Sequence, residues 1–160
     1  MIIIGVGEYS ASRAPGDGLK TFALGSCVAV ILYDAASQVA GMAHVALPDS
    51  SINRGKSGEL PGYFADTAVP ALLAAVRQAN EGRLPPGLHA RLAGGASILR
   101  GQEQFQIGKR NVAAVRTALA KFNVRISREE VGGSVSRTVS VDVQSGSISI
   151  FSPGRAERTL

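Results

Sequence analysis

One cysteine and one histidine carry the clearest chemical potential in this sequence. Cys27 is the single cysteine among 160 residues and directly precedes the apolar residues 28–33, while His44 lies in a second apolar segment, residues 38–47. The ordinary pKa of a thiol is about 8.5, and an adjacent imidazolium raises the thiolate fraction. The pair therefore predicts attack of a thiolate on an amide carbonyl, protonation of the departing nitrogen, and hydrolysis of the thioester.

Both apolar segments are typical of strands and predict an antiparallel hairpin. If the hairpin turns symmetrically about Ala35 and Ala36, Cys27 and His44 lie directly opposite each other, with Cβ atoms roughly 4.5–5.5 Å apart. A bulge or a three-residue turn would shift this register. Without such pairing, Cys27 would be a buried small hydrophobe and His44 a hydrogen-bonded histidine at a strand end.

The residues just before Cys27 predict the rest of a catalytic site. Gly25 and Ser26 favour a tight turn whose backbone N–H groups converge on one point, as an oxyanion hole requires. Thr21 is a candidate to orient the ring of His44. Because six strand residues span about 20 Å, Thr21 reaches the site only if the chain reverses near Gly25.

Composition excludes several classes of function. We expect a single domain over residues 1–160, in the cytoplasm, because no segment has the length of a membrane helix and the apolar start has no basic region before it. One cysteine forms no internal disulfide, and with two histidines it implies neither a metal site nor a cofactor. The net charge of +5 suggests an acidic partner, but the scattered arginines and 5% aromatic content do not favour nucleic acid.

Periodicity and turn residues predict an α+β fold, a layered α/β sandwich of mostly antiparallel β-sheets with two or three packed helices. The predicted strands cover residues 1–6, a segment near residue 19, and residues 28–33, 38–47, 90–99, 124–131, 139–143 and 148–150. The predicted helices cover residues 65–79, capped by Asp66 or Thr67, and residues 111–122, capped by Asn111. Pro70 is expected to be tolerated only in a first helical turn. Residues 8–18 and 50–61 predict loops.

Two further patterns constrain the sheets. Gly94 and Gly95 lie inside a strand-like segment, where the backbone must bend or approach another group closely. The strand at residues 28–33 is apolar at every position, so we expect its sheet to be covered on both faces.

Several short motifs occur in order along nearly the whole chain. They are Thr21; Leu24, Gly25, Ser26, Cys27 and Val28; Asp34; Gly41, Met42, Ala43 and His44; Leu47 and Pro48; Tyr63, Ala65 and Asp66; Gly94, Gly95 and Ala96; Ile107, Gly108, Arg110 and Asn111; and Gly132, Gly133 and Arg137. In these motifs the chain resembles the chemoreceptor glutamine deamidases called CheD.

The resemblance implies a layered α/β fold and a triad of Cys27 as nucleophile, His44 as acid and base, and Thr21 as the orienting group. It implies hydrolysis of selected glutamine side chains of chemoreceptors to glutamate, with release of ammonia. The implied partners are the cytoplasmic helical bundle of a chemoreceptor and a phosphatase called CheC, which competes with receptors in this family.

The sequence differs from the family pattern beside the predicted site, at Ala43, Val45, Ala46 and Ala93. These differences bear on substrate preference and partner affinity, since the three triad residues are present. Two alternatives remain open: a non-catalytic adaptor that binds receptors or a CheC-type phosphatase, and a small-molecule amidase or cysteine protease.

Overall fold

Two β-sheets packed face to face, with helices on the outer face of one of them, make up the fold. The computed structural model describes residues 1–98 and 102–160, and the side chains of residues 1–98 and 106–160. Sheet A contains, in spatial order, β1 (Ile2–Ile3), β3 (Gly18–Leu24), β8 (Arg137–Asp142), β9 (Ile148–Phe151) and β10 (Arg158–Thr159). Sheet B contains β2 (Tyr9–Ser12), β5 (Val39–Val45), β4 (Val28–Asp34), β6 (His89–Gly94) and β7 (Arg125–Val131).

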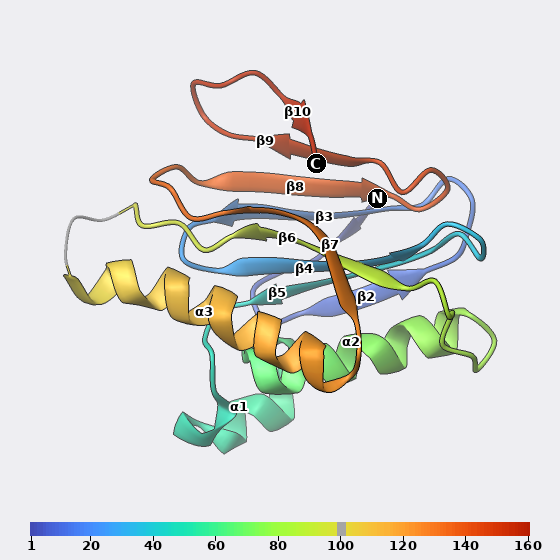
Figure 1. Cartoon of the computed structure of the whole chain (residues 1–160), viewed down its shortest axis with the longest axis horizontal. Helices are drawn as coiled ribbons and strands as arrows, with labels where there is room; N and C mark the ends of the chain where they lie inside the picture. Colours follow the sequence, from blue (N-terminus) through green and yellow to red (C-terminus); the bar gives the residue numbers. More distant parts are fainter. Residues whose placement is uncertain (99–101) are drawn as a thin grey trace.

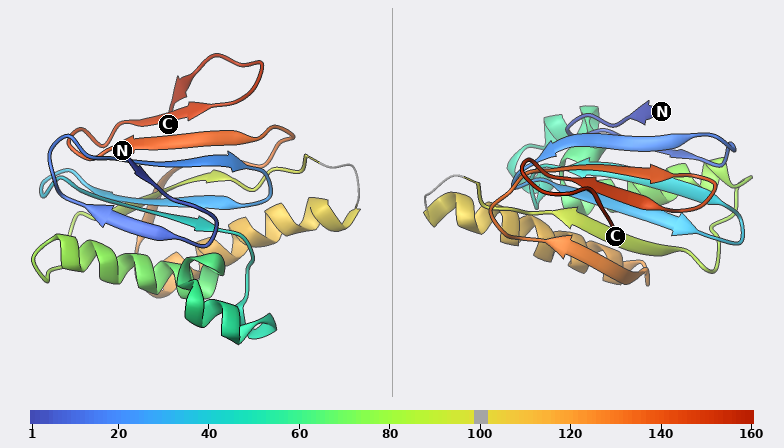
Figure 2. Two further views of the ribbon diagram at one scale, coloured as in Figure 1. Left: turned by 180° about the vertical axis from the view of Figure 1, so that it is seen from behind. Right: turned by 90° about the horizontal axis from the view of Figure 1, so that it is seen from above.

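Neighbouring strands in both sheets are antiparallel, apart from the parallel pairs β1–β3 and β6–β7. The helices α2 (Ala65–Ala79) and α3 (Gln102–Lys121) lie on the side of the molecule opposite β8, β9 and β10 (Figures 1 and 2). The expected α+β sandwich of mostly antiparallel sheets is therefore confirmed, and sheet B is its middle layer.

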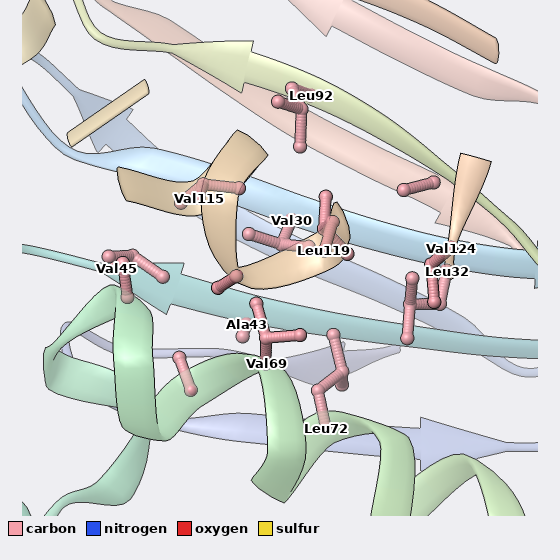
Figure 3. Packing of buried hydrophobic residues seen from close by; sticks show 14 of the residues in the cluster. Val30, Leu32, Ala43, Val45, Val69, Leu72, Leu92, Val115, Leu119 and Val124 are labelled. Atoms are coloured by element: carbon pink, nitrogen blue, oxygen red, sulfur yellow. The ribbon is translucent and has the colours of Figure 1, made fainter. Parts of the chain in front are cut away.

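The centre of sheet B is buried on both faces, as the sequence of residues 28–33 predicts. Every residue of β4 and β5 is buried. Alternate side chains of β4 enter two different cores: Val28, Val30 and Leu32 pack against the helices, and Ala29 and Ile31 pack against sheet A. Figure 3 shows the first core, with side chains of α2 and α3 directed toward β4, β5 and β6. A strand between two apolar layers needs no polar face, which explains its continuous run of apolar residues.

Helix α2 has the predicted bounds, but its predicted cap and proline position are wrong. The residue before its first turn is the fully buried Phe64, with no side-chain cap, while the carboxylate of Asp66 accepts hydrogen bonds from the N–H and hydroxyl of Ser50. The hydroxyl of Thr67 donates to Pro61 O and Phe64 O. Pro70 lies inside the helix, where it removes one backbone hydrogen bond. Burial of Phe64 fixes the start of this helix in place of a capping side chain.

Helix α3 begins earlier than predicted, so Asn111 is not its cap. Asn111 lies mid-helix and is fully buried. Val112, Val115 and Leu119 face the core as expected, whereas Phe122 follows the helix and is 47% exposed. The residues near the start of α3 are mostly polar and show no helical periodicity of apolar residues, so the sequence did not predict the first turns of this helix.

Two predicted loops contain regular structure. Strand β2 lies within residues 8–18, and residues 50–61 include the 3-10 helix η1 (Ser50–Ile52) and the helix α1 (Arg54–Glu59), with a second 3-10 helix, η2 (Pro61–Tyr63), after them. The sequence of β2, Tyr-Ser-Ala-Ser, gives no strand pattern, because pairing with β5 at the sheet edge decides its conformation. The predicted strand at residues 90–99 corresponds to β6, which ends at Gly94; residues 95–98 are not strand, and Leu99 lies outside the described residues.

Candidate active site

The hairpin of β4 and β5 has a different register from the predicted one. His44 pairs with Ala29, and Val28 pairs with Val45, so Cys27 is not directly opposite His44. The four residues 35–38 make the turn, which the carboxylate of Asp34 closes by accepting from the N–H and hydroxyl of Ser37. The side chains of Cys27 and His44 nevertheless lie on the same face of the sheet. The observed register differs from the predicted one by two residues, and side chains along a strand alternate between faces with a period of two.

That shared face looks toward sheet A, which supplies the third residue. Cys27 is half-buried, and packs against the core between the sheets together with Ala29. Residues 25–27 carry the chain from β3 of sheet A into β4 of sheet B, so the chain reverses where the sequence required it to. Thr21 is consequently buried against His44, with its Oγ1 2.7 Å from the Nδ1 of the ring.

A bulge in β3 follows Thr21 directly. The pairing of β3 with β8 shifts between Thr21 and Leu24, and Ala23 has a φ of 53°, in the left-handed region. Such a bulge bends the strand and changes the direction of the next side chains. It ends regular pairing just before residues 25–27 cross between the sheets.

The hydrogen bonds of Thr21 fix the tautomer of His44. The Thr21 hydroxyl is 2.7 Å from the carbonyl oxygen of Ile4, which can only accept. With its single proton donated there, Thr21 Oγ1 accepts from the Nδ1–H of His44. The Nε2 atom of the neutral ring then carries the lone pair, and it is buried with no partner among the residues that the structure describes. The ring thus presents an unpartnered acceptor nitrogen, which is what the predicted role of His44 as a general base requires.

Burial sets the protonation of both groups. Desolvation lowers the pKa of His44 to about 4, and it raises the pKa of the Cys27 thiol, which the backbone N–H of Cys27 opposes in part. The predicted imidazolium beside the thiol is therefore not favoured in the free protein. If Cys27 and His44 have their predicted roles, the neutral imidazole would accept the thiol proton as attack occurs, and His44 would act as a base before it acts as an acid.

The carbonyl groups of residues 25–27, just before β4, all accept hydrogen bonds from other segments of the chain. Gly25 O accepts from Ala96 N at 2.8 Å, and Cys27 O accepts from Gly95 N at 2.8 Å. Ser26 O accepts from a side chain of α3 at 2.9 Å. In a trans peptide the N–H points opposite to the C=O, so the N–H groups of Ser26 and Cys27 are directed away from these partners. The chain bends at Gly25 and Ser26, and the candidate oxyanion donors there are the N–H groups of Ser26 and Cys27.

Comparison with known proteins identifies the family. The family model described as CheD chemotactic sensory transduction matches residues 46–152. The chain is 44% identical over 156 residues to the probable chemoreceptor glutamine deamidase CheD of Syntrophotalea carbinolica, covering 98% of this chain and 96% of that protein. It is 38% identical to the chemoreceptor glutamine deamidase CheD of Thermotoga maritima, covering 98% and 94%. This chain belongs to the CheD family.

Among solved structures, a crystal structure of the Bacillus licheniformis hypothetical protein YfiH is similar, with a TM-score of 0.40 and 18% identity, over 76% of this chain and 49% of that chain. The CheD family model begins after Thr21, Cys27 and His44, whereas the two CheD relatives align over nearly the full length. Within the described residues, no group of three or more histidine, cysteine, aspartate or glutamate side chains is placed to hold a metal ion. Among the described helices, none is long and apolar enough to cross a membrane.

Two contacts of the backbone at Cys27 and Ser26 complete the description of the candidate site: the sequence signalled one of them and gave no sign of the other. Gly94, with a φ of 113°, lies against the carbonyl oxygen of Cys27, and the paired glycines of the sequence did signal such a close approach. Asn111 of α3 is the side chain that binds Ser26 O. No local signal identifies that contact, because it joins residues 85 positions apart.

Replacing Thr21 tests the orientation of the ring. Thr21→Val removes the hydroxyl and leaves the Nδ1–H of His44 and the carbonyl of Ile4 without this partner. We expect the free energy of unfolding to fall by about 1–3 kcal/mol. We also expect kcat for glutamine deamidation to fall about tenfold or more, since 1.4 kcal/mol of lost positioning is a factor of ten. Thr21→Ser keeps the hydroxyl and should retain both the stability and the kcat of the wild type. Equal losses in the two variants would contradict the role of the Thr21 hydroxyl in orienting His44.

The depressed pKa of His44 predicts a specific dependence of stability on pH. The unfolded chain binds a proton at His44 below about pH 6.5, whereas the folded protein binds it only near pH 4. The contribution of His44 is therefore complete above pH 6.5 and is lost as the pH falls toward 4. Because His44 is 3% exposed, this loss amounts to about 3 kcal/mol.

Urea unfolding of the wild type and of His44→Gln at pH 7, 5.5 and 4.5 measures this contribution of His44 to the free energy of unfolding. The wild type should lose more stability than the variant, since the carboxylates contribute equally to both. Parallel losses would show that the ring is not desolvated in the folded protein.

Proposed function

We propose that this CheD-family protein is a chemoreceptor glutamine deamidase that hydrolyses side-chain amides of specific glutamines in methyl-accepting chemotaxis proteins to glutamate and ammonia. The observation that carries the proposal is the pairing of Thr21 Oγ1 with His44 Nδ1, which leaves Nε2 available on the face that also holds Cys27. The names of the CheD relatives supply the substrate.

The proposed first half-reaction forms a thioester. His44 Nε2 takes the proton of the Cys27 thiol as the sulfur attacks the amide carbon of a glutamine side chain. The N–H groups of Ser26 and Cys27, in the turn begun by Gly25, stabilise the oxyanion. As the tetrahedral intermediate collapses, His44 donates its proton to the departing nitrogen, and ammonia leaves.

The second half-reaction restores the enzyme. His44, neutral again, removes a proton from a water molecule that attacks the thioester carbon. The carbon–sulfur bond breaks, the thiol of Cys27 regains a proton, and the glutamine has become a glutamate. Thr21 holds the ring through both steps, because the same Nε2 must face the sulfur and then the water.

Mass spectrometry of a purified chemoreceptor cytoplasmic fragment incubated with the protein tests the function. Each converted glutamine gains the mass difference between an amide and an acid. We expect conversion at particular glutamines with the wild type and none with Cys27→Ala. Retained effects of Cys27→Ala on receptor signalling, without conversion, would instead indicate a non-catalytic adaptor. Faster hydrolysis of free glutamine or of unfolded peptides would indicate a small-molecule amidase or a protease.

The proposed partners follow from the substrate. We expect the protein to act in the cytoplasm on the helical bundle of a receptor, and a CheC-type phosphatase is a second proposed partner that would compete with receptors for binding. Nucleic acid and membrane insertion have no part in this proposal.

Charge should contribute to receptor binding. A receptor bundle becomes more acidic as its glutamines are converted, and this protein carries a net charge of +5. Raising the salt concentration from about 0.05 to 0.5 M should therefore weaken binding to the receptor fragment, mainly through a slower association rate. Surface plasmon resonance at several salt concentrations measures this, and a salt-independent association rate would refute the electrostatic contribution.

A further inference from the structure

Asn111 is a fully buried polar side chain that binds the segments on both sides of the site. Its Nδ2 donates to the carbonyl oxygens of Ser26 and of Ala46, each at 2.9 Å. Both partners can only accept, so the amide nitrogen must face them and the orientation of the side chain is settled. One group on α3 thereby joins the turn before β4 to the end of β5.

These two carbonyls flank the reacting residues. Ser26 directly precedes Cys27, and Ala46 follows His44 by two residues. If the register of β4 and β5 is continued by one position, Cys27 falls opposite Ala46. Asn111 therefore links the backbone just before Cys27 to the backbone just after His44.

The bond to Ser26 controls the direction of a specific donor. The Ser26 carbonyl and the Cys27 N–H belong to one peptide plane, and they point in opposite directions. A carbonyl held toward α3 directs the N–H away from α3, and the backbone N–H of Cys27 is near enough to its own thiol to lower the pKa of that group in part. If this bond is absent, the peptide can rotate, and the N–H loses its direction without any change in the side chain of Cys27.

Packing alone does not explain an asparagine here. The Oδ1 of Asn111 is buried without a donor among the residues that the structure describes. Leaving a buried amide oxygen without a partner costs about 1–3 kcal/mol. A leucine would fill a similar space without that cost, but it would offer no N–H to Ser26 and Ala46.

The neighbouring contacts fix the rest of the same turn. Gly95 N and Ala96 N hold the carbonyls of Cys27 and Gly25. A Cβ added to Gly108 would lie 2.5 Å from Gly95 O, so α3 packs directly against that loop. Asn111 is thus on a rigid element, one helical turn from this contact, and can hold the Ser26–Cys27 peptide without moving.

We propose that Asn111 is a positioning residue for the deamidation: it locks the Ser26–Cys27 peptide so that the Cys27 N–H stabilises the oxyanion. The inference rests on the proposed function, because the oxyanion forms only when the thiolate attacks an amide carbonyl.

The test separates oxyanion stabilisation from thiol reactivity. Methyl methanethiosulfonate transfers a methylthio group to a thiolate and releases methanesulfinate, with no carbonyl attack and hence no oxyanion. Since Cys27 is the single cysteine, intact mass reports on it alone. The same preparations are assayed for deamidation of the receptor fragment and for stability in urea.

For Asn111→Ala we expect kcat for deamidation to fall roughly 100-fold, the typical effect of losing one oxyanion donor. The rate constant with methyl methanethiosulfonate should change less than about threefold, because thiolate content governs it. Asn111→Ser, a smaller change, serves as the second variant if Asn111→Ala folds poorly. The control Asn80→Ala removes a half-buried asparagine whose side-chain amide donates to Arg83 O, and should leave both rates unchanged.

Proportional losses in both rates, or no loss in either, with an active wild type, would overturn the role of Asn111. A wild type that reacts with methyl methanethiosulfonate but converts no receptor glutamine would instead overturn the proposed function, and the inference with it. A loss confined to KM would assign Asn111 to substrate binding and would also overturn the proposal.

Discussion

Cys27→Ser will lower kcat for receptor glutamine deamidation by roughly 10⁴-fold or more, and His44→Ala will have an effect of similar size. A serine hydroxyl keeps a proton that the thiol gives up readily, and removal of either member of a nucleophile–base pair typically costs this much. In the proposed mechanism the Nε2 of His44, whose ring is held by Thr21, is the base, so the loss of the ring would leave the thiol with its raised pKa and without that acceptor for its proton.

The double variant gives the sharper result. Since the proposed mechanism uses Cys27 and His44 in the same steps, the variant that lacks both should be no slower than either single variant. Rates of conversion at one receptor glutamine, measured by mass spectrometry, provide the comparison, and thermal unfolding shows whether each variant is folded. Multiplicative losses would mean that the two residues act independently and would refute the proposed mechanism.

Gly94→Ala will have the largest effect on stability together with a loss of activity. Gly94 has a φ of 113°, and a Cβ at this position would overlap the carbonyl oxygen of Cys27. The overlap is with backbone, so no side chain can move aside. The strand end must shift away from Cys27, which also breaks the bond from Gly95 N to Cys27 O. We expect the free energy of unfolding to fall by roughly 3 kcal/mol or more.

Gly16→Ala is the matched control for this substitution. Gly16 has a φ of 88°, but no atom lies within 4 Å of its added Cβ. Gly16→Ala should therefore lower the free energy of unfolding only by the backbone strain of an alanine in the left-handed region, about 1–2 kcal/mol. Urea unfolding and deamidation rates of the two variants separate strain from overlap. Equal losses of stability, with activity kept in Gly94→Ala, would show that Cys27 is not held by this contact.

The local sequence pattern was sufficient to predict those strands and helices whose structure depends mainly on the burial of apolar side chains. The apolar residues of β4 and β5 predict strands buried on both faces, and the spacing in residues 65–79 predicts α2, because burial of a periodic apolar surface determines both. The sequence also singled out Cys27, His44 and Thr21 through their chemistry and through the motifs of the CheD family.

Prediction failed where a distant partner decides the local structure. Residues 9–12 form the strand β2 because they pair with β5 at the edge of sheet B. Helix α2 begins after the buried Phe64, with no capping side chain. Asn111 has the preferences of a helix cap, yet its side chain finds two carbonyls on other elements. Long-range hydrogen bonds of this kind have no signature within a short window of sequence.

The sequence by itself determined which chemistry is available: a single thiol after a Gly-Ser pair, a histidine on the next strand, and a threonine before them. Only the tertiary structure decided how these groups are arranged. The turn closed by Asp34 sets a register two positions from the symmetric one, and the crossing between the sheets brings Thr21 to the Nδ1 of His44. Burial between the sheets then lowers the pKa of His44, since desolvation depends on the layers that surround the ring and not on its neighbours in sequence.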